Sequence, residues 1–107
     1  MLEIGSIVYL KKGTQKVMVV SRGAIFKQNG KEVLYDYSAC LYPTGINPQE
    51  LFYFNEENID AILFSGFHDE EEERFQELYK EWHLNEGQKL EKGLIGSTKT
   101  TSNLGFE

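Results

Sequence analysis

Apolar and polar residues alternate, or form short apolar runs, over the first two-thirds of the chain, and both patterns predict β-strands. We expect one strand over residues 4–11 and a second over residues 16–22, where β-branched residues flank the turn sequence KGTQ. Asn29-Gly30 is typical of a tight hairpin and separates a strand near residues 24–28 from the strand that follows. The first part of the chain therefore predicts β-hairpins.

A longer strand is expected over residues 31–42, and its alternation predicts which side chains form the core. The set that we place on the core face is Val33, Tyr35, Tyr37, Ala39 and Leu41. Residues 43–50 contain both prolines and are expected to form a surface loop. Two shorter strands are expected over residues 51–55 and 59–66, joined by a turn or a single helical turn at NEEN.

Several of the expected strands, such as IVYL and VMVV, are apolar at consecutive positions, which is typical of strands covered on both sides. One amphipathic helix cannot cover both faces of an open sheet, so either the sheet curls or another segment covers the second face. We therefore predict an α+β fold. It consists of an antiparallel β-sheet, or a small partly closed β-barrel, of about five to six strands with one C-terminal amphipathic helix.

The helix is predicted by the segment HDEEEERFQELYKEW at residues 68–82. Asp69 is suited to cap its N-terminus, and Glu72 completes a capping-box-like pair. The neighbouring carboxylates face the positive end of the helix macrodipole, so we interpret the acidic run as a solvated helix start. At about 100° per residue, the apolar residues fall on one stripe. This stripe consists of Phe75, Leu78, Tyr79 and Trp82.

The stripe is suited to two uses: it packs on the chain's own sheet, or it docks on a partner helix. We favour the first use, because a small domain needs its apolar faces for the core. Glu71 lies on the same stripe, one turn ahead of Phe75, and helix formation does not explain its position. Trp82 lies near the helix end and is expected to be partly covered. We therefore predict Glu71 and Trp82 as partner-binding residues.

After Trp82 the chain becomes rich in Gly, Ser, Thr, Asn and Lys and has no sustained hydrophobic period. Such a composition is typical of segments that do not contribute to a packed core. We therefore predict a single globular domain over residues 1–83 and a mostly flexible C-terminal tail over residues 84–107.

The charge of the chain limits its partners. Its 107 residues carry a formal net charge of −6. This argues against non-specific nucleic-acid binding, which needs clustered Lys and Arg. We therefore expect no nucleic-acid partner. The alternative is a small-barrel nucleic-acid-binding protein, and it rests on the basic residues near the first expected hairpin. These are Lys11, Lys12, Lys16 and Arg22.

The cysteine content and the N-terminal sequence predict the compartment. The single Cys40 cannot form an internal disulfide, which favours a reducing environment. The sequence MLEIGSIVYL lacks the basic region of a signal peptide, and no apolar run reaches the length of a membrane span. We expect a cytoplasmic protein that does not contact a membrane.

Residue types with catalytic potential are present but are not arranged in a known pattern. Cys40, His68 or His83, and Asp36 are the residue types of a thiol nucleophile site, yet no local signature marks them. The two histidines and one cysteine make no zinc pattern. We therefore predict no catalytic, cofactor-binding or metal-binding residues, and a protein that is not an enzyme.

Three segments carry a family resemblance: IGSIVYLKKGTQKVMVVSRG, YDYSACLYPTGINPQELFYFNEENID and LFSGFHDEEEERFQELYKEW. In this order they resemble a small family of uncharacterised function in Gram-positive bacteria, encoded beside LXG-domain toxins of the type VII secretion system. The resemblance covers residues 4–82. It implies a chaperone or targeting partner for the helical LXG region of a cognate toxin, together with further small helical accessory proteins. It brings no established catalytic residues.

Overall fold

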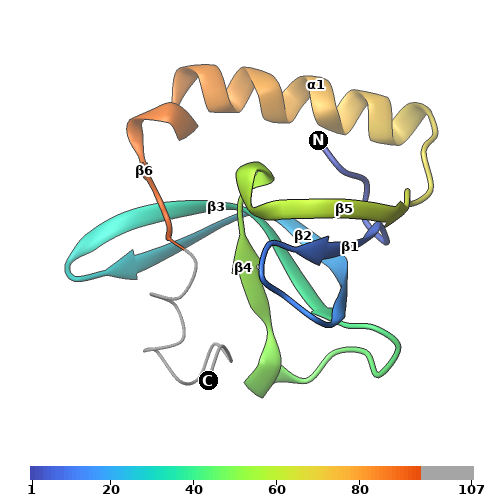
Figure 1. The fold of residues 1–107 in the computed structure, drawn as a ribbon. Helices are drawn as coiled ribbons and strands as arrows, with labels where there is room; N and C mark the ends of the chain where they lie inside the picture. The colour runs from blue at the N-terminus through green and yellow to red at the C-terminus, as the bar shows by residue number, and fades with distance from the viewer. Residues whose placement is uncertain (95–107) are drawn as a thin grey trace.

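The computed structural model describes residues 1–94, and these form one β-sheet with a helix above it (Figure 1). The strands are β1 (Ile7–Leu10), β2 (Lys16–Gln28), β3 (Lys31–Leu41), β4 (Phe52–Phe54), β5 (Ile59–Phe64) and β6 (Glu91–Lys92). The helix is α1 (Glu70–Asn85), and the short 3-10 helices are η1 (Pro48–Glu50), η2 (Glu56–Asn58) and η3 (Gly87–Lys89). Residues 95–107 lie outside this description.

The sheet is open and mostly antiparallel. Its strands follow the order β4-β3-β2-β1-β5, and each neighbouring pair in this order is antiparallel. β6 lies outside this path and pairs with β3 in the parallel direction. Because β4 and β5 lie at opposite ends of the order, the sheet does not close into a barrel. The predicted α+β fold is thus confirmed, and of its two forms the sheet is the one observed.

A single long strand, β2, replaces the two strands that we expected over residues 16–22 and 24–28. It has 13 residues and pairs with β3 along most of its length. A register shift between Val19 and Ser21 marks a β-bulge, and Gly23 has a positive φ of 73°. Bulges of this kind bend a strand without ending it, which explains why the local pattern suggested two segments.

Two of the predicted turns are confirmed. Asn29 and Gly30 have φ angles of 52° and 79°, as the tight hairpin between β2 and β3 requires. The sequence NEEN forms the single helical turn η2. Asn55 precedes this turn, and its backbone N–H donates to Asn58 Oδ1 at 2.8 Å.

The predicted core face of β3 is confirmed. Val33, Tyr35, Tyr37 and Ala39 are buried, and Leu41 is partly buried. The opposite face of β3 also contains buried residues: Leu34, Ser38 and Cys40. This strand is therefore covered on both faces over most of its length, although α1 alone could cover only one.

The buried side chains form two clusters along the sheet. The larger cluster consists of Leu2, Val8, Leu10, Val17, Val19, Tyr37, Ala39 and Phe54. The smaller one, at the far end of the β2–β3 hairpin, consists of Val33, Tyr35 and Tyr53. Leu2 belongs to the larger cluster although it precedes the first strand, so the N-terminal segment contributes directly to the core.

The N-terminus of α1 confirms the predicted cap. Asp69 has an extended backbone, and its Oδ1 accepts a hydrogen bond from the Glu72 backbone N–H at 3.0 Å. The Glu72 carboxylate does not complete the capping box that we expected. It accepts hydrogen bonds from Arg22 in β2 and from Gln76 one turn later in the helix. The acidic helix start therefore also makes a tertiary contact.

The fold continues beyond the boundary that we predicted at residue 83. α1 ends at Asn85, and the chain then forms η3 and β6. Gly93 is buried, and its backbone N–H donates to the Leu34 carbonyl at 2.8 Å. Residues 84–94 of the predicted tail thus belong to the end of α1, η3 and the β6 segment, and the β6 segment contacts the sheet. The part over residues 95–107 lies outside the described residues.

Candidate partner-binding surface

An ion pair between Arg22 and Glu72 attaches α1 to the sheet. The two guanidinium nitrogens of Arg22 donate to the two carboxylate oxygens of Glu72, with distances of 2.5 and 2.9 Å. Only 6% of the Arg22 side chain and 9% of the Glu72 side chain are exposed. The hydrogen bonds from Arg22 lower the pKa of Glu72, so this carboxyl group is charged at neutral pH. The Arg22 guanidinium also lies 4.0 Å from the ring centroid of Phe75.

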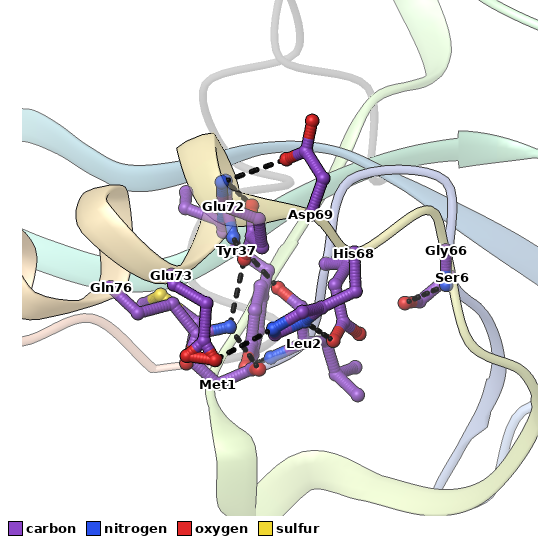
Figure 2. Close-up of polar contacts among 12 residues, drawn as sticks. Met1, Leu2, Ser6, Tyr37, Gly66, His68, Asp69, Glu72, Glu73 and Gln76 are labelled. Carbon is purple, nitrogen blue, oxygen red and sulfur yellow. Dashed lines mark hydrogen bonds and ion pairs between the residues drawn. The ribbon is translucent and has the colours of Figure 1, made fainter.

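The N-terminal segment lies between α1 and the strands (Figure 1). The Leu2 backbone N–H donates to the Tyr37 hydroxyl at 2.7 Å, and its carbonyl accepts from Arg22 at 3.2 Å. On the helix side, Gln76 Nε2 donates to the Met1 carbonyl at 3.3 Å (Figure 2). Backbone and polar groups of this segment therefore occupy part of the space beneath α1, where apolar helix residues would otherwise pack on the sheet.

His68 connects the same segment to the start of the helix. Its Nδ1 lies 2.6 Å from a Glu3 carboxylate oxygen, and its Nε2 lies 3.1 Å from a Glu73 carboxylate oxygen. These two carboxylates raise the pKa of His68 above its usual value, with Glu3 contributing more. Figure 2 shows His68 between the two elements, beside the hydrogen bond from Gly66 to Ser6.

Tyr79 packs where β2 has no side chain. A Cβ atom on Gly23 would lie only 2.8 Å from the Tyr79 ring, so the ring occupies the space left by this glycine. Burial raises the pKa of the Tyr79 hydroxyl. Near the helix end, a Cβ on Gly87 would lie 2.7 Å from the Trp82 ring. The rings of Tyr79 and Trp82, the covered aromatic residues of the stripe, thus pack against glycines that leave room for them.

The expectation that the whole apolar stripe packs on the sheet is wrong. Phe75 is 37% exposed and Leu78 is 47% exposed. The rotation of α1 about its axis explains this result. Glu72 faces the sheet, and Leu78 lies about 120° from Glu72 around the helix. The ion pair and the N-terminal segment determine which side of α1 faces the strands. The apolar stripe is therefore only half covered.

The two residues predicted to bind a partner lie at the edges of this stripe. Glu71 is exposed at the helix start, on the same side as Phe75. Trp82 is partly buried, with its ring 5.5 Å from the ring of Tyr79 and against Gly87. The structure therefore places Glu71 and Trp82 beside the exposed Phe75 and Leu78, and these four residues define what we call the stripe surface.

An open groove of about 700 Å³ follows the other side of α1. Four carboxylates and two lysines line it: Asp36, Glu56, Glu73, Glu77, Lys80 and Lys92. Several of these charges already have partners. Lys92 contacts Glu57 at 2.8 Å and Asp36 at 3.8 Å, and this lysine lowers the pKa of Glu57. The groove therefore carries charges of both signs, with carboxylates in excess.

The basic residues of the first hairpin do not form one surface. Arg22 is buried in its ion pair with Glu72, whereas Lys11, Lys12 and Lys16 are exposed. We expected Arg22 in this basic set, whereas the structure shows that it holds the helix on the sheet. A signal was present in the sequence, because Arg22 lies two residues after the apolar run VMVV in a chain that also contains an acid-rich helix.

The residue types of the thiol site are separated by their contacts. Cys40 is buried in β3, and burial raises the pKa of its thiol. His68 contacts Glu3 and Glu73 at the helix start. Asp36 accepts a hydrogen bond from the Glu56 backbone N–H at 2.9 Å. Over residues 1–94, no three His, Cys, Asp or Glu side chains gather in a metal-binding group.

The chain matches a known family model. The family model Domain of unknown function (DUF4176) matches residues 1–75. The chain belongs to this family. The DUF4176 match covers strands β1 to β5 and the first six residues of α1, so it includes both Arg22 and Glu72. No curated protein and no solved structure matches the chain.

DUF4176 membership agrees with the predicted family of uncharacterised function, and the association with LXG toxins stays a prediction. Among the helices of residues 1–94, none combines the length and the apolar character needed to cross a membrane.

Proposed function

We propose that this DUF4176 protein is a non-enzymatic accessory protein of the cytoplasm. It binds the helical LXG region of a cognate type VII-secreted toxin and supports the stability or export of that toxin, alone or with further small helical accessory proteins. The observation that carries the proposal is the stripe surface, where Phe75 and Leu78 remain exposed on a helix whose orientation is held by other contacts.

The stripe surface has the properties that an amphipathic partner helix requires. Helices bind one another through side chains spaced three and four residues apart, and Glu71, Phe75, Leu78 and Trp82 have this spacing. Large aromatic residues anchor such interfaces, whereas charges at the rim mainly affect the association rate. Trp82 is therefore the proposed anchor, and Glu71 is a rim charge that favours a basic residue on the toxin.

Co-expression with the toxin's LXG segment, followed by affinity capture, tests this proposal. We expect Leu78→Lys and Trp82→Ala to reduce capture at least tenfold, and Glu71→Lys to reduce it less. The matched control is Leu84→Lys, the same substitution on the same helix at a residue that is 58% exposed and lines the groove. Thermal melting of each variant alone verifies that it is folded.

The outcomes separate the binding face from the function. If Leu84→Lys abolishes capture and the three stripe variants do not, the groove is the binding face. If all four variants melt normally and capture the segment as well as the unaltered protein, α1 is not the contact. If the unaltered protein does not capture the segment, the proposed function is wrong.

A further inference from the structure

A second candidate surface lies along the edge strand β5. In the order of the sheet this strand is terminal and pairs with β1. Edge strands carry backbone N–H and C=O groups that can pair with another strand. β5 has six residues, whereas the strand at the opposite end, β4, has three. β5 is therefore the longer of the two edges.

Apolar side chains are exposed along this edge. Ile62, Leu63 and Phe64 are 54%, 48% and 58% exposed, and Phe67 just beyond the strand is 79% exposed. Ile4 is also exposed and lies beside this segment, because a Cβ on Gly66 would lie 2.0 Å from the Ile4 carbonyl oxygen. We call these five residues the β5 patch: Ile4, Ile62, Leu63, Phe64 and Phe67. Contiguous exposed apolar residues of this kind mark interaction surfaces.

The β5 patch contrasts with the rest of the chain in charge. Residues 61–67 have the sequence AILFSGF and carry no charge, although 26% of the chain is charged and its net charge is −6. Natural edge strands commonly carry a lysine, a proline or another charge that prevents pairing. In β5 only Asp60, near its start, serves in this way. An uncharged surface does not select a partner by its charge.

We propose that two copies of this chain associate through the β5 patch, with their β5 strands antiparallel about a two-fold axis. A two-fold pairing with Ile62 of one copy opposite Leu63 of the other places Asp60 opposite Ser65. No like charges then oppose one another within the contact, even though each copy is acidic overall. Contacts in which both copies use the same surface are the commonest kind in symmetric dimers.

The dimer is weak. The β1–β5 ladder has register shifts near both of its ends, between Ile7 and Val8 and between Tyr9 and Leu10. Such shifts bend β5, which limits the length over which it can pair with a second copy. The patch also has only five apolar residues, fewer than the roughly 20–30 residues a side of a standard interface. We therefore expect a dissociation constant on the order of 10–100 μM. Because both copies carry −6, added salt screens their repulsion and strengthens the dimer.

Sedimentation velocity of the full chain over a wide concentration range tests the proposal. The expected result is a shift from the 12.3 kDa monomer towards twice this mass, with more dimer at high salt. Leu63→Lys and Phe64→Lys should weaken the dimer at least tenfold, since each places two lysines near the axis. Two matched controls, Ile25→Lys on β2 and Leu78→Lys on α1, change exposed apolar residues elsewhere and should leave it intact. Thermal melting verifies that each variant folds.

Three results would overturn the proposal. The first is a monomer at every concentration and salt level. The second is a dimer that survives both β5 substitutions, and the third is a dimer that is lost with Leu78→Lys. If the unaltered chain stays monomeric and the β5 variants lose capture of the LXG segment, the patch binds the toxin and not a second copy. The stripe proposal is unaffected by these results, because it is read from Leu78→Lys and Trp82→Ala.

Discussion

Arg22 and Glu72, separated by 50 residues in sequence, form a bidentate ion pair that is almost fully buried between β2 and α1. Arg22 also contacts the Leu2 carbonyl and the ring of Phe75. One arginine therefore connects the sheet, the N-terminal segment and the helix. The side of α1 that faces the sheet is the side that carries Glu72, and the apolar stripe is turned partly towards solvent as a result.

Glu72→Gln should lower the free energy of unfolding by roughly 3–5 kcal/mol, because it leaves the buried Arg22 without a counter-charge. The matched control is Glu77→Gln. Its partner Arg74 lies at 3.5 Å, and both side chains are more than two-thirds exposed, so the cost should stay below about 1 kcal/mol. Urea denaturation at neutral pH measures both values. Equal values for the two variants would contradict the structural role of the buried pair.

We predict that the stability of the folded protein depends on pH through His68. Glu3 and Glu73 raise its pKa above the usual 6.5, so the protonated imidazole stabilises the folded state. This contribution is complete below pH 6.5 and is lost as the pH rises through the higher pKa of the folded state. The melting temperature of the unaltered protein should therefore fall relative to that of His68→Gln as the pH rises above 6.5.

Glu73→Gln serves as the intermediate case for this measurement. It removes one of the two carboxylates and should reduce the pH-dependent difference without abolishing it. Parallel pH profiles for the unaltered protein and His68→Gln would show that the contact does not persist in solution.

Two phenylalanines distinguish the core from the stripe surface. Phe54 is fully buried, so Phe54→Ala should destabilise the protein by roughly 3–5 kcal/mol. Phe75 is 37% exposed and contacts Arg22, so Phe75→Ala should cost about 1 kcal/mol, mainly from the lost cation–π contact. Chemical denaturation of the two variants checks this difference. A loss at Phe75 as large as that at Phe54 would mean that the stripe is core.

Gly93 tests whether the segment after α1 belongs to the fold. An added Cβ would lie 2.1 Å from the Tyr35 ring, and the Gly93 carbonyl accepts a hydrogen bond from Asn55 at 2.8 Å. Gly93→Ala should therefore detach β6 and cost roughly 1–3 kcal/mol, the usual range for overpacking. Hydrogen exchange should show faster exchange at residues 91–94, whereas Lys89→Ala, at an exposed side chain, should not. Unchanged exchange in Gly93→Ala would place β6 outside the stable fold.

Local patterns in the sequence were sufficient for several of the elements. The hairpin at Asn29-Gly30 follows from the backbone preferences of two adjacent residues, and the Asp69 cap from one side chain and a nearby N–H. The buried face of β3 follows from alternation with a period of two. Each of these depends on neighbours along the chain, and each was predicted correctly.

Contacts between distant residues were decided only by the tertiary structure. Helical periodicity shows that Phe75, Leu78 and Trp82 share a face, but it does not show where that face points. Its direction depends on Arg22, Glu72 and the N-terminal segment, which meet only after folding. The pairing of β6 with β3 has the same origin, since a two-residue strand carries no period of its own. Local patterns in the sequence therefore predicted most of the elements, whereas long-range contacts decided the pairing of β6 and which side of α1 stays exposed.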